Sequence, residues 1–128
     1  MPLSDLAAAL AAATGPDRAL DERLGVSLFG LTPRSDGWWD GPPLRGRLIH
    51  LMYPEPPAYT SSLDAITGAI REKWPRAIVR TRETAYESGA ELGAVGLGKH
   101  NTLVERPASV ALALCLAAVR LALAEEGR

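Results

Sequence analysis

The chain has 128 residues, a formal net charge of −1, 47 % hydrophobic residues and 5 % aromatic residues. This length fits one compact core, which buries roughly two thirds of the surface that the unfolded chain exposes. The balanced charge excludes a whole-protein attraction to nucleic acid or to an anionic membrane. We therefore expect a single domain over residues 1–128, with neither nucleic acid nor a membrane as partner.

Cellular location is indicated by the cysteine content and by the chain start. Cys115 is a single cysteine and forms no internal disulfide, as expected in a reducing compartment. The first five residues carry an acid where a secretory leader carries basic residues. The longest apolar run, Ala108 to Val119, is well under the roughly 20 residues that a bilayer requires. These features predict a cytoplasmic protein.

Two helices are predicted in residues 1–29. Ser4 is the expected N-cap of the first, an alanine-rich helix that stops near Gly15. Asp17 is the expected N-cap of the second, whose apolar stripe holds Leu20, Leu24 and Leu28. Its polar stripe is formed by Arg18, Asp21, Glu22 and Arg23. The pair lacks the basic recognition face of a DNA-binding helix-turn-helix.

Residues 30–57 are rich in proline and glycine and hold one predicted strand. That strand runs from Leu44 to Tyr53, an apolar stretch with no proline inside it. Proline cannot donate a hydrogen bond to a neighbouring strand, so prolines are expected only outside it. Those that bracket it are Pro33, Pro42, Pro43, Pro54, Pro56 and Pro57.

Residues 58–128 read as a helix, a strand hairpin and a second helix. Ser61 and Asp64 resemble a capping box for the first helix, and Pro75 ends it. Its helically spaced apolar residues are Leu63, Ile66, Ile70 and Trp74. The hairpin is predicted from strands over 77–84 and 91–97, joined by a turn at 87–89.

The last helix is expected from Pro107 to Glu125 and is apolar on most of its surface. Such a helix is buried on more than one side. We expect it to pack on the sheet and on a second copy of the chain, which predicts a homo-oligomer through residues 107–125. The fold class that follows is α+β, with a small antiparallel or mixed sheet sandwiched between helices.

The segment from Pro56 to Glu125 resembles the phage ABA sandwich domain, a family of small phage and prophage proteins. The markers are the Pro-Ala-Tyr-Thr stretch that ends at Thr60, a tryptophan at the end of the following helix, and the small-residue-rich last helix. The stretch Trp38-Trp39-Asp40 is similar to the aromatic entry in such proteins. The resemblance implies a helix-sheet-helix fold and the cytoplasm of an infected or lysogenic bacterium. It implies no catalytic residue.

A glycine-rich motif, Gly93 to Lys99, matches the spacing of a phosphate-binding P-loop. His100 stands where a P-loop has the serine or threonine that holds magnesium, and helix signals wait until Pro107. We therefore predict a glycine-rich strand and turn. A weaker alternative is an anion held by the glycine amides and Lys99.

Catalytic and metal-binding constellations are not predicted. His50 and His100 are isolated in the sequence, without the spacing of metal ligands. Cys115 lies among leucines and alanines and is expected to be inert core. We expect no cofactor, no metal and no enzymatic activity.

Aromatic and basic residues gather in the proline-rich region and predict a ligand site. Four of the seven aromatic residues lie there, close to two arginines and a histidine. The predicted set is Trp38, Trp39, Arg45, Arg47, His50, Tyr53 and Tyr59, with Arg80, Arg82 and Lys99 as further basic groups. Aromatic faces stack on bases and arginines bind phosphates, which indicates a nucleotide-like ligand. The structural alternative is that the aromatics pin a loop onto the core beside solvated arginines.

Three classes of function remain at this point. The first is a non-catalytic phage accessory protein that sequesters a nucleotide-derived host immune signal, which requires a pocket lined by aromatics. The second is an interaction or assembly protein of the phage, which requires a flat apolar patch. The third is a small nucleotide-acting enzyme, in which Lys99 or His100 faces a cleft.

Overall fold

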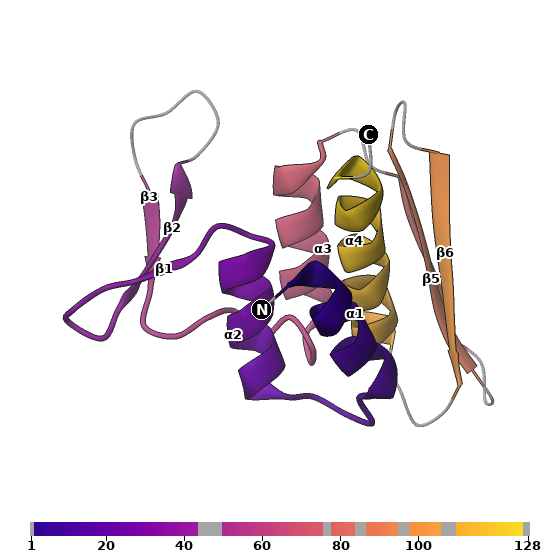
Figure 1. Ribbon diagram of the computed structural model, residues 1–128, viewed down its shortest axis with the longest axis horizontal. Coiled ribbons are helices and arrows are strands. Elements are labelled where there is room, and N and C mark those ends of the chain that lie inside the picture. The colour runs from indigo at the N-terminus through magenta and orange to yellow at the C-terminus, as the bar shows by residue number, and fades with distance from the viewer. Residues whose placement is uncertain are drawn as a thin grey trace.

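The computed structural model describes residues 2–43, 50–75, 78–83, 87–94, 98–105 and 110–126. The helices are α1 (Leu3–Ala12), α2 (Arg18–Ser27), α3 (Leu63–Lys73) and α4 (Val110–Glu126). The strands are β1 (Thr32–Pro33), β2 (Trp39–Pro43), β3 (His50–Tyr53), β4 (Ile78–Glu83), β5 (Glu87–Ala94) and β6 (Gly98–Glu105). The helices lie between two three-stranded antiparallel sheets, β1-β2-β3 and β4-β5-β6 (Figure 1). The predicted α+β class, with a small antiparallel sheet packed against helices, is confirmed.

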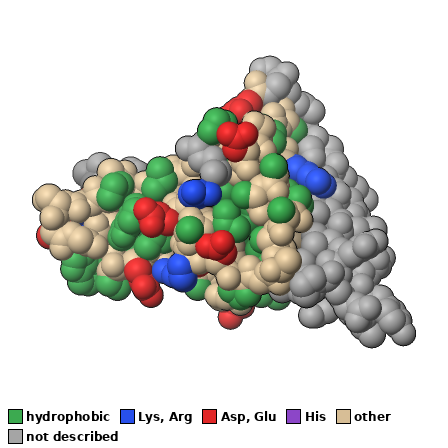
Figure 2. All heavy atoms as spheres, turned by 60° about the horizontal axis from the view of Figure 1, so that its bottom comes forward, with side chains coloured by type: hydrophobic (Ala, Val, Ile, Leu, Met, Phe, Trp, Pro, Cys, Tyr) green, Lys and Arg blue, Asp and Glu red, His purple; other side chains and the backbone are tan. Residues whose placement is uncertain are grey.

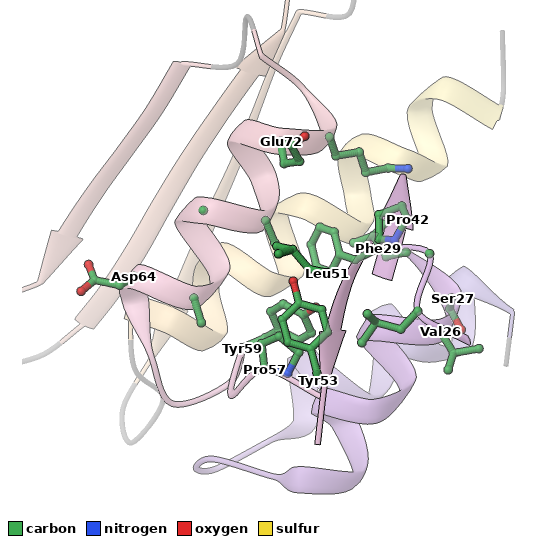
Figure 3. A pocket seen from close by; sticks show the side chains of 17 residues that line it. Val26, Ser27, Phe29, Pro42, Leu51, Tyr53, Pro57, Tyr59, Asp64 and Glu72 are labelled. Carbon is green, nitrogen blue, oxygen red and sulfur yellow. The ribbon is translucent and has the colours of Figure 1, made fainter. Parts of the chain in front are cut away.

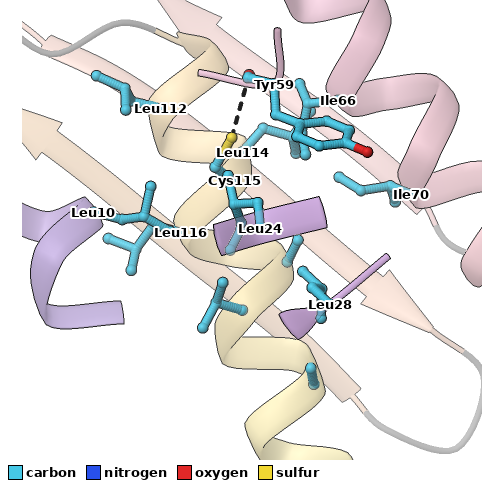
Figure 4. Packing of buried hydrophobic residues seen from close by; sticks show 14 of the residues in the cluster. Leu10, Leu24, Leu28, Tyr59, Ile66, Ile70, Leu112, Leu114, Cys115 and Leu116 are labelled. Atoms are coloured by element: carbon cyan, nitrogen blue, oxygen red, sulfur yellow. Dashed lines mark hydrogen bonds between the residues drawn. The ribbon is translucent and has the colours of Figure 1, made fainter. Parts of the chain in front are cut away.

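Helix α4 forms the centre of the core. It contacts β4, β5 and β6 on one side and α1 and α3 on another. Leu114 and Cys115 of α4 are fully buried in one cluster with leucines and isoleucines of the other helices (Figure 4). Each buried leucine contributes about 1.5–3 kcal/mol. No helix in the described ranges is long and apolar enough to cross a bilayer.

The predicted burial of the last helix on more than one side is confirmed. Both sides, however, are covered by elements of the same chain. The apolar breadth of α4 is therefore accounted for without a second copy. It no longer supports the predicted homo-oligomer through residues 107–125.

Of the first two helices, only α2 has an N-cap side chain that accepts backbone hydrogen bonds. Asp17 caps α2 as predicted, since its carboxylate accepts the backbone N–H groups of Ala19 and Leu20. The predicted cap of α1, Ser4, is wrong. Helix α1 begins at Leu3, and Pro2 stands at the N-cap without a side-chain hydrogen bond. The fixed φ of proline suits this place, where no donor is needed.

The cap of α3 lies one residue later than the sequence predicted. The Ser62 hydroxyl accepts the Ala65 N–H at 3.2 Å, whereas the Ser61 hydroxyl donates to the Ala58 carbonyl at 3.4 Å. The reason is a turn in which the Ser62 N–H also bonds the Ala58 carbonyl, at 2.8 Å, so Ser61 lies inside the turn. The predicted end is confirmed, with Trp74 as the C-cap.

The described residues between 30 and 57 form three strands, where the sequence predicted one. Strand β2 is central and pairs Trp39 with both Pro33 and Tyr53. Its two prolines lie beyond the end of β1, and the register with β3 shifts between Asp40 and Pro43. Proline has no backbone N–H to donate, but these two prolines have no partner in β1, so no hydrogen bond to β1 is lost. Strand β3 lies within the predicted strand, of which residues 44–49 are outside the described residues.

The second sheet has one strand more than the predicted hairpin. The strand predicted over 77–84 is confirmed over Ile78–Glu83. The turn predicted at 87–89 is wrong, because Ser88 and Gly89 already pair with β4 as part of β5. Strand β6 was not predicted, since its sequence is mostly polar and carries no clear apolar alternation. Of the predicted strand over 91–97, residues 91–94 belong to β5.

Candidate ligand-binding site

A pocket of about 750 Å³ lies between the end of α2, the β2–β3 strand pair and one face of α3 (Figure 3). Most of its wall is apolar or aromatic, and a few polar groups stand among these side chains. Small-molecule sites in proteins commonly have this size and character. Strands β2 and β3, which border the pocket, lie on the opposite side of the helices from β4–β6 (Figure 1).

The first wall is built by the end of α2 and the turn after it. Leu31 folds back over Gly25, where an added Cβ would come within 2.4 Å of the Leu31 Cδ1. Gly30 has a φ of 73°, in the left-handed region that favours glycine, and reverses the chain. Phe29 is thereby buried beside Tyr59, with ring centroids 4.9 Å apart. Both rings belong to the pocket wall.

The second wall is one face of β3. Successive side chains of a strand point to opposite faces, so Leu51 and Tyr53 share the face that lines the pocket. The Tyr53 ring lies across Gly41 of β2, where an added Cβ would meet its Cε2 at 3.1 Å. A glycine at this point allows the ring to lie close to the neighbouring strand.

The third wall is a strip of small residues on α3. Ala65, Gly68 and Ala69 follow one another at helical spacing on one face. A Cβ added to Gly68 would meet no atom within 4 Å, so the space above this residue is open. The charged residues of the described lining are also on α3 and are exposed: Asp64, Glu72 and Lys73.

Tyr59 is positioned by a buried polar network behind the pocket. Asp21, 1 % exposed, accepts the Thr60 N–H at 2.7 Å and the Thr60 hydroxyl at 2.8 Å. Its other oxygen pairs with Arg18 at 2.8 Å, and Arg18 also donates to the Pro56 carbonyl at 2.6 Å. The sequence predicted that Asp21 lies on a polar stripe of α2. The structure corrects this, because the segment 56–62 covers that side of the helix.

Cys115 lies next to this network and completes the anchoring of Tyr59. Its thiol donates to the Tyr59 carbonyl at 3.3 Å (Figure 4). Burial, together with the charge of Asp21, raises the pKa of the Cys115 thiol. The thiol is therefore protonated and shielded, as predicted for inert core.

The phenol of Tyr59 stays neutral at physiological pH. Burial raises the pKa of this phenol, and the nearby Tyr53 phenol and Asp21 carboxylate raise it further. In the described part of the chain, the hydrogen bonds of Tyr59 are made by its backbone N–H and carbonyl. Its hydroxyl is thus a neutral hydrogen-bond donor beside that of Tyr53 (Figure 3).

The predicted site residues are brought together only in part. Tyr53 and Tyr59 both line the pocket. Trp38 and Trp39 do not, since Trp38 is 43 % exposed at a turn and Trp39 is paired within the first sheet. His50 pairs with Pro43 in the backbone of the same sheet. Arg45 and Arg47 lie outside the described residues, so their part in the site stays a prediction.

The remaining predicted basic residues belong to the other sheet. The backbones of Arg80 and Arg82 lie in β4, and that of Lys99 lies in β6 opposite Gly93. The helices lie between this sheet and the strands β2 and β3 that border the pocket (Figure 1). Because Lys99 lies in β6 rather than at a helix start, the P-loop arrangement is excluded. The predicted glycine-rich strand is confirmed over residues 91–94, and residues 95–97 lie outside the described part of the chain.

The α3 strip and Phe29 were not predicted from the sequence. Ala65, Gly68 and Ala69 carry a readable signal, since small residues at helical spacing mark a face that something approaches closely. Phe29 carries no such signal, because its direction depends on the left-handed turn at Gly30. Asp21 was also missed, since only the returning segment 56–62 shows that it is buried.

Comparison with protein-family models, with curated proteins and with solved structures finds no match to the chain. The resemblance to the phage ABA sandwich domain therefore remains an expectation from the sequence markers.

Proposed function

We propose that the protein is a non-catalytic binding module for a small organic molecule, held in the pocket between β2–β3 and α3. The observation that supports this proposal most strongly is the apolar pocket of about 750 Å³ with two tyrosines in its wall. Tyr59 is 3 % exposed and is held from behind by the Asp21–Thr60 network. A wall fixed in this way is pre-organised, which lowers the ordering cost of binding.

The biological setting of the proposal comes from the family resemblance. It is that of a phage or prophage accessory protein, which sequesters a nucleotide-derived host signal and releases it unchanged. The pocket aromatics suit a base, and Arg45 and Arg47 are the residues predicted to bind its phosphates. These arginines lie in the segment of the chain that joins β2 and β3.

The test is a thermal-shift screen against mono-, di- and cyclic nucleotides and ADP-ribose derivatives. At a hundred times the dissociation constant, a ligand stabilises the folded protein by about 2.7 kcal/mol, which is several degrees in a domain of this size. Chromatography of the recovered ligand is expected to show it unchanged. A chemically altered ligand contradicts the non-catalytic proposal, and no shift with any compound contradicts binding of this ligand class.

The location of the site is tested with a pocket-filling variant. Gly68→Leu places a side chain in open space and is expected to abolish the shift. Thr67→Leu, one residue earlier and outside the pocket wall, is the matched control and is expected to keep it. The double variant Arg45→Ala, Arg47→Ala tests whether these arginines bind the phosphates of the ligand. If the thermal shift with a nucleotide is unchanged, the prediction of a nucleotide ligand loses its support.

A second candidate function is an assembly protein that binds another protein through the first sheet. Trp38 is 43 % and Met52 46 % exposed, and both lie outside the pocket wall. Figure 2 shows hydrophobic, acidic and basic side chains interspersed on the described part of one face. Replacing Trp38 and Met52 by serine is expected to leave ligand-dependent stabilisation intact. Loss of a protein partner with retained pocket binding favours this second candidate.

A further inference from the structure

The residues of the pocket wall indicate which kind of small molecule the pocket can bind. Resting on the proposed function, we infer that the pocket holds an uncharged planar heteroaromatic ring, flat against Ala65, Gly68 and Ala69. The hydroxyls of Tyr53 and Tyr59 donate hydrogen bonds to an acceptor on that ring. A nucleobase and a free heteroaromatic metabolite share this chemistry.

The shape of the α3 strip favours a flat molecule. Three small residues at helical spacing leave the helix backbone open to close approach. Nothing lies within 4 Å of a Cβ added at Gly68, so the open space begins directly at the helix. A ring face in van der Waals contact, at about 3.5–4 Å, fits against such a surface over its whole area. A branched or globular group contacts it at fewer points.

The opposite wall supplies rings and an aliphatic side chain. Phe29, Leu51 and Tyr53 are drawn together on that side of the pocket in Figure 3. Aromatic pairs gain about 0.5–1.5 kcal/mol beyond their buried area when offset or edge-to-face. A ligand ring placed between these side chains and the α3 strip is therefore covered on both faces.

The two tyrosine hydroxyls indicate which polar atom the buried part of the ligand carries. The Tyr59 hydroxyl is buried, and in the described part of the chain its hydrogen bonds come from its backbone alone. A buried donor gains from a partner, and an acceptor atom on the ligand provides one. The charged side chains of the described lining are exposed on α3, so the wall around the phenols is neutral. A ring carbonyl or ring nitrogen matches this environment, whereas a charged group would lose its hydration there.

The experiment measures dissociation constants by ligand-observed NMR for four probes. Quinazolin-4-one is a free heteroaromatic with acceptors, and naphthalene is a ring system of similar size without them. Adenosine and adenosine monophosphate test whether the ring belongs to a nucleoside or a nucleotide. Naphthalene is expected to bind at least five-fold more weakly than quinazolin-4-one.

Two conservative variants test the hydroxyl donors. Tyr53→Phe and Tyr59→Phe keep the rings, and each is expected to weaken quinazolin-4-one about five-fold, the size of one hydrogen bond. Neither is expected to change naphthalene binding. Gly68→Leu is expected to remove binding of all four probes, and Thr67→Leu to keep it.

The outcomes separate this inference from the proposed function. If none of the probes, nor any compound of the wider screen, binds the wild-type chain, the binding function itself fails. If the probes bind and Gly68→Leu removes their binding, the pocket is the binding site. If naphthalene then has the same dissociation constant as quinazolin-4-one, and the phenylalanine variants change neither, the inference that the ligand ring carries an acceptor is wrong. Tighter binding of adenosine monophosphate than of adenosine identifies a nucleotide source, and equal binding identifies the ring alone.

Discussion

At the residue scale, one buried carboxylate connects the chain's local structure to its pocket. Asp21 accepts two hydrogen bonds from Thr60 and pairs with Arg18, which in turn holds the Pro56 carbonyl. A carboxylate this deeply buried is tolerated because its partners replace its hydration. The same contacts fix the loop that carries Tyr59 into the pocket wall.

The first prediction concerns this carboxylate. Asp21→Ala removes the acceptor of the buried Thr60 N–H and the carboxylate partner of Arg18, and is expected to lower the free energy of unfolding by about 3 kcal/mol. Asp40→Ala is the control, since Asp40 faces Arg34 at 3.3 Å on the surface. Exposed pairs contribute about 0–1 kcal/mol, so the control changes little. Urea unfolding measures both, and equal losses contradict the role given to Asp21.

The second prediction concerns the pH dependence of stability. The Cys115 thiol titrates near 8.5 in the unfolded chain, and its pKa in the folded protein is raised by burial. Below pH 8.5 both states keep the proton, so this group has no effect. Above it the unfolded state loses the proton and stability falls, by up to about 1.4 kcal/mol per pH unit.

Urea unfolding between pH 8 and 9.5 measures this slope. Cys115→Ala is expected to have a lower stability throughout, because the Tyr59 carbonyl loses its donor, but a flatter slope. The same slope in both proteins contradicts the assignment to Cys115. Rapid reaction of the folded protein with a thiol reagent would independently contradict the burial of Cys115.

At the element scale, caps and glycines decide where the helices end and how closely they are packed. The periodic apolar residues of α2, α3 and α4 made these helices predictable, because a buried stripe repeats along the sequence. Their exact starts were less predictable, because Ser61 and Ser62 are chemically alike and the turn at Ala58 selects the second. Strand β2 was not predicted, because Pro42 and Pro43 argue against a strand that has neighbours on both sides. The sequence does not show that β1 ends before it reaches these prolines.

The third prediction compares the two serines. Ser62→Ala removes the acceptor for the Ala65 N–H and is expected to destabilise the protein by about 1 kcal/mol. Ser61→Ala removes a long bond to the Ala58 carbonyl on the surface and is expected to change stability by less than about 0.5 kcal/mol. Thermal unfolding distinguishes them, and the reverse order contradicts the observed cap.

The fourth prediction compares two helical glycines. Gly68→Ala adds a methyl in open space and is expected to stabilise the protein by up to about 1 kcal/mol through helix propensity. Gly25→Ala gains the same propensity but forces Leu31 away, and overpacking costs about 1–3 kcal/mol. A net loss of about 1 kcal/mol is expected. Stabilisation by both variants in urea unfolding contradicts the close packing of Leu31 on Gly25.

At the scale of the whole molecule, the helices separate two sheets that have different positions relative to the pocket. The β1–β3 sheet borders the pocket, whereas β4–β6 covers α4 on the other side (Figure 1). The sequence grouped Tyr53 with Tyr59, and both lie in the wall of one pocket. It grouped them with Arg80 and Arg82 because no sequence signal shows on which side of the helices a strand lies.

Binding of a planar ligand in the pocket between β3 and α3 can be tested directly. The most direct measurement is a ¹H–¹⁵N NMR titration of the whole chain with quinazolin-4-one and with the best nucleotide from the screen. The amide shifts are expected to concentrate on Ala65, Gly68 and Ala69 and on Phe29 and Tyr53 across the pocket. Shifts confined to β4–β6, or to the exposed Trp38 turn, would contradict binding in this pocket.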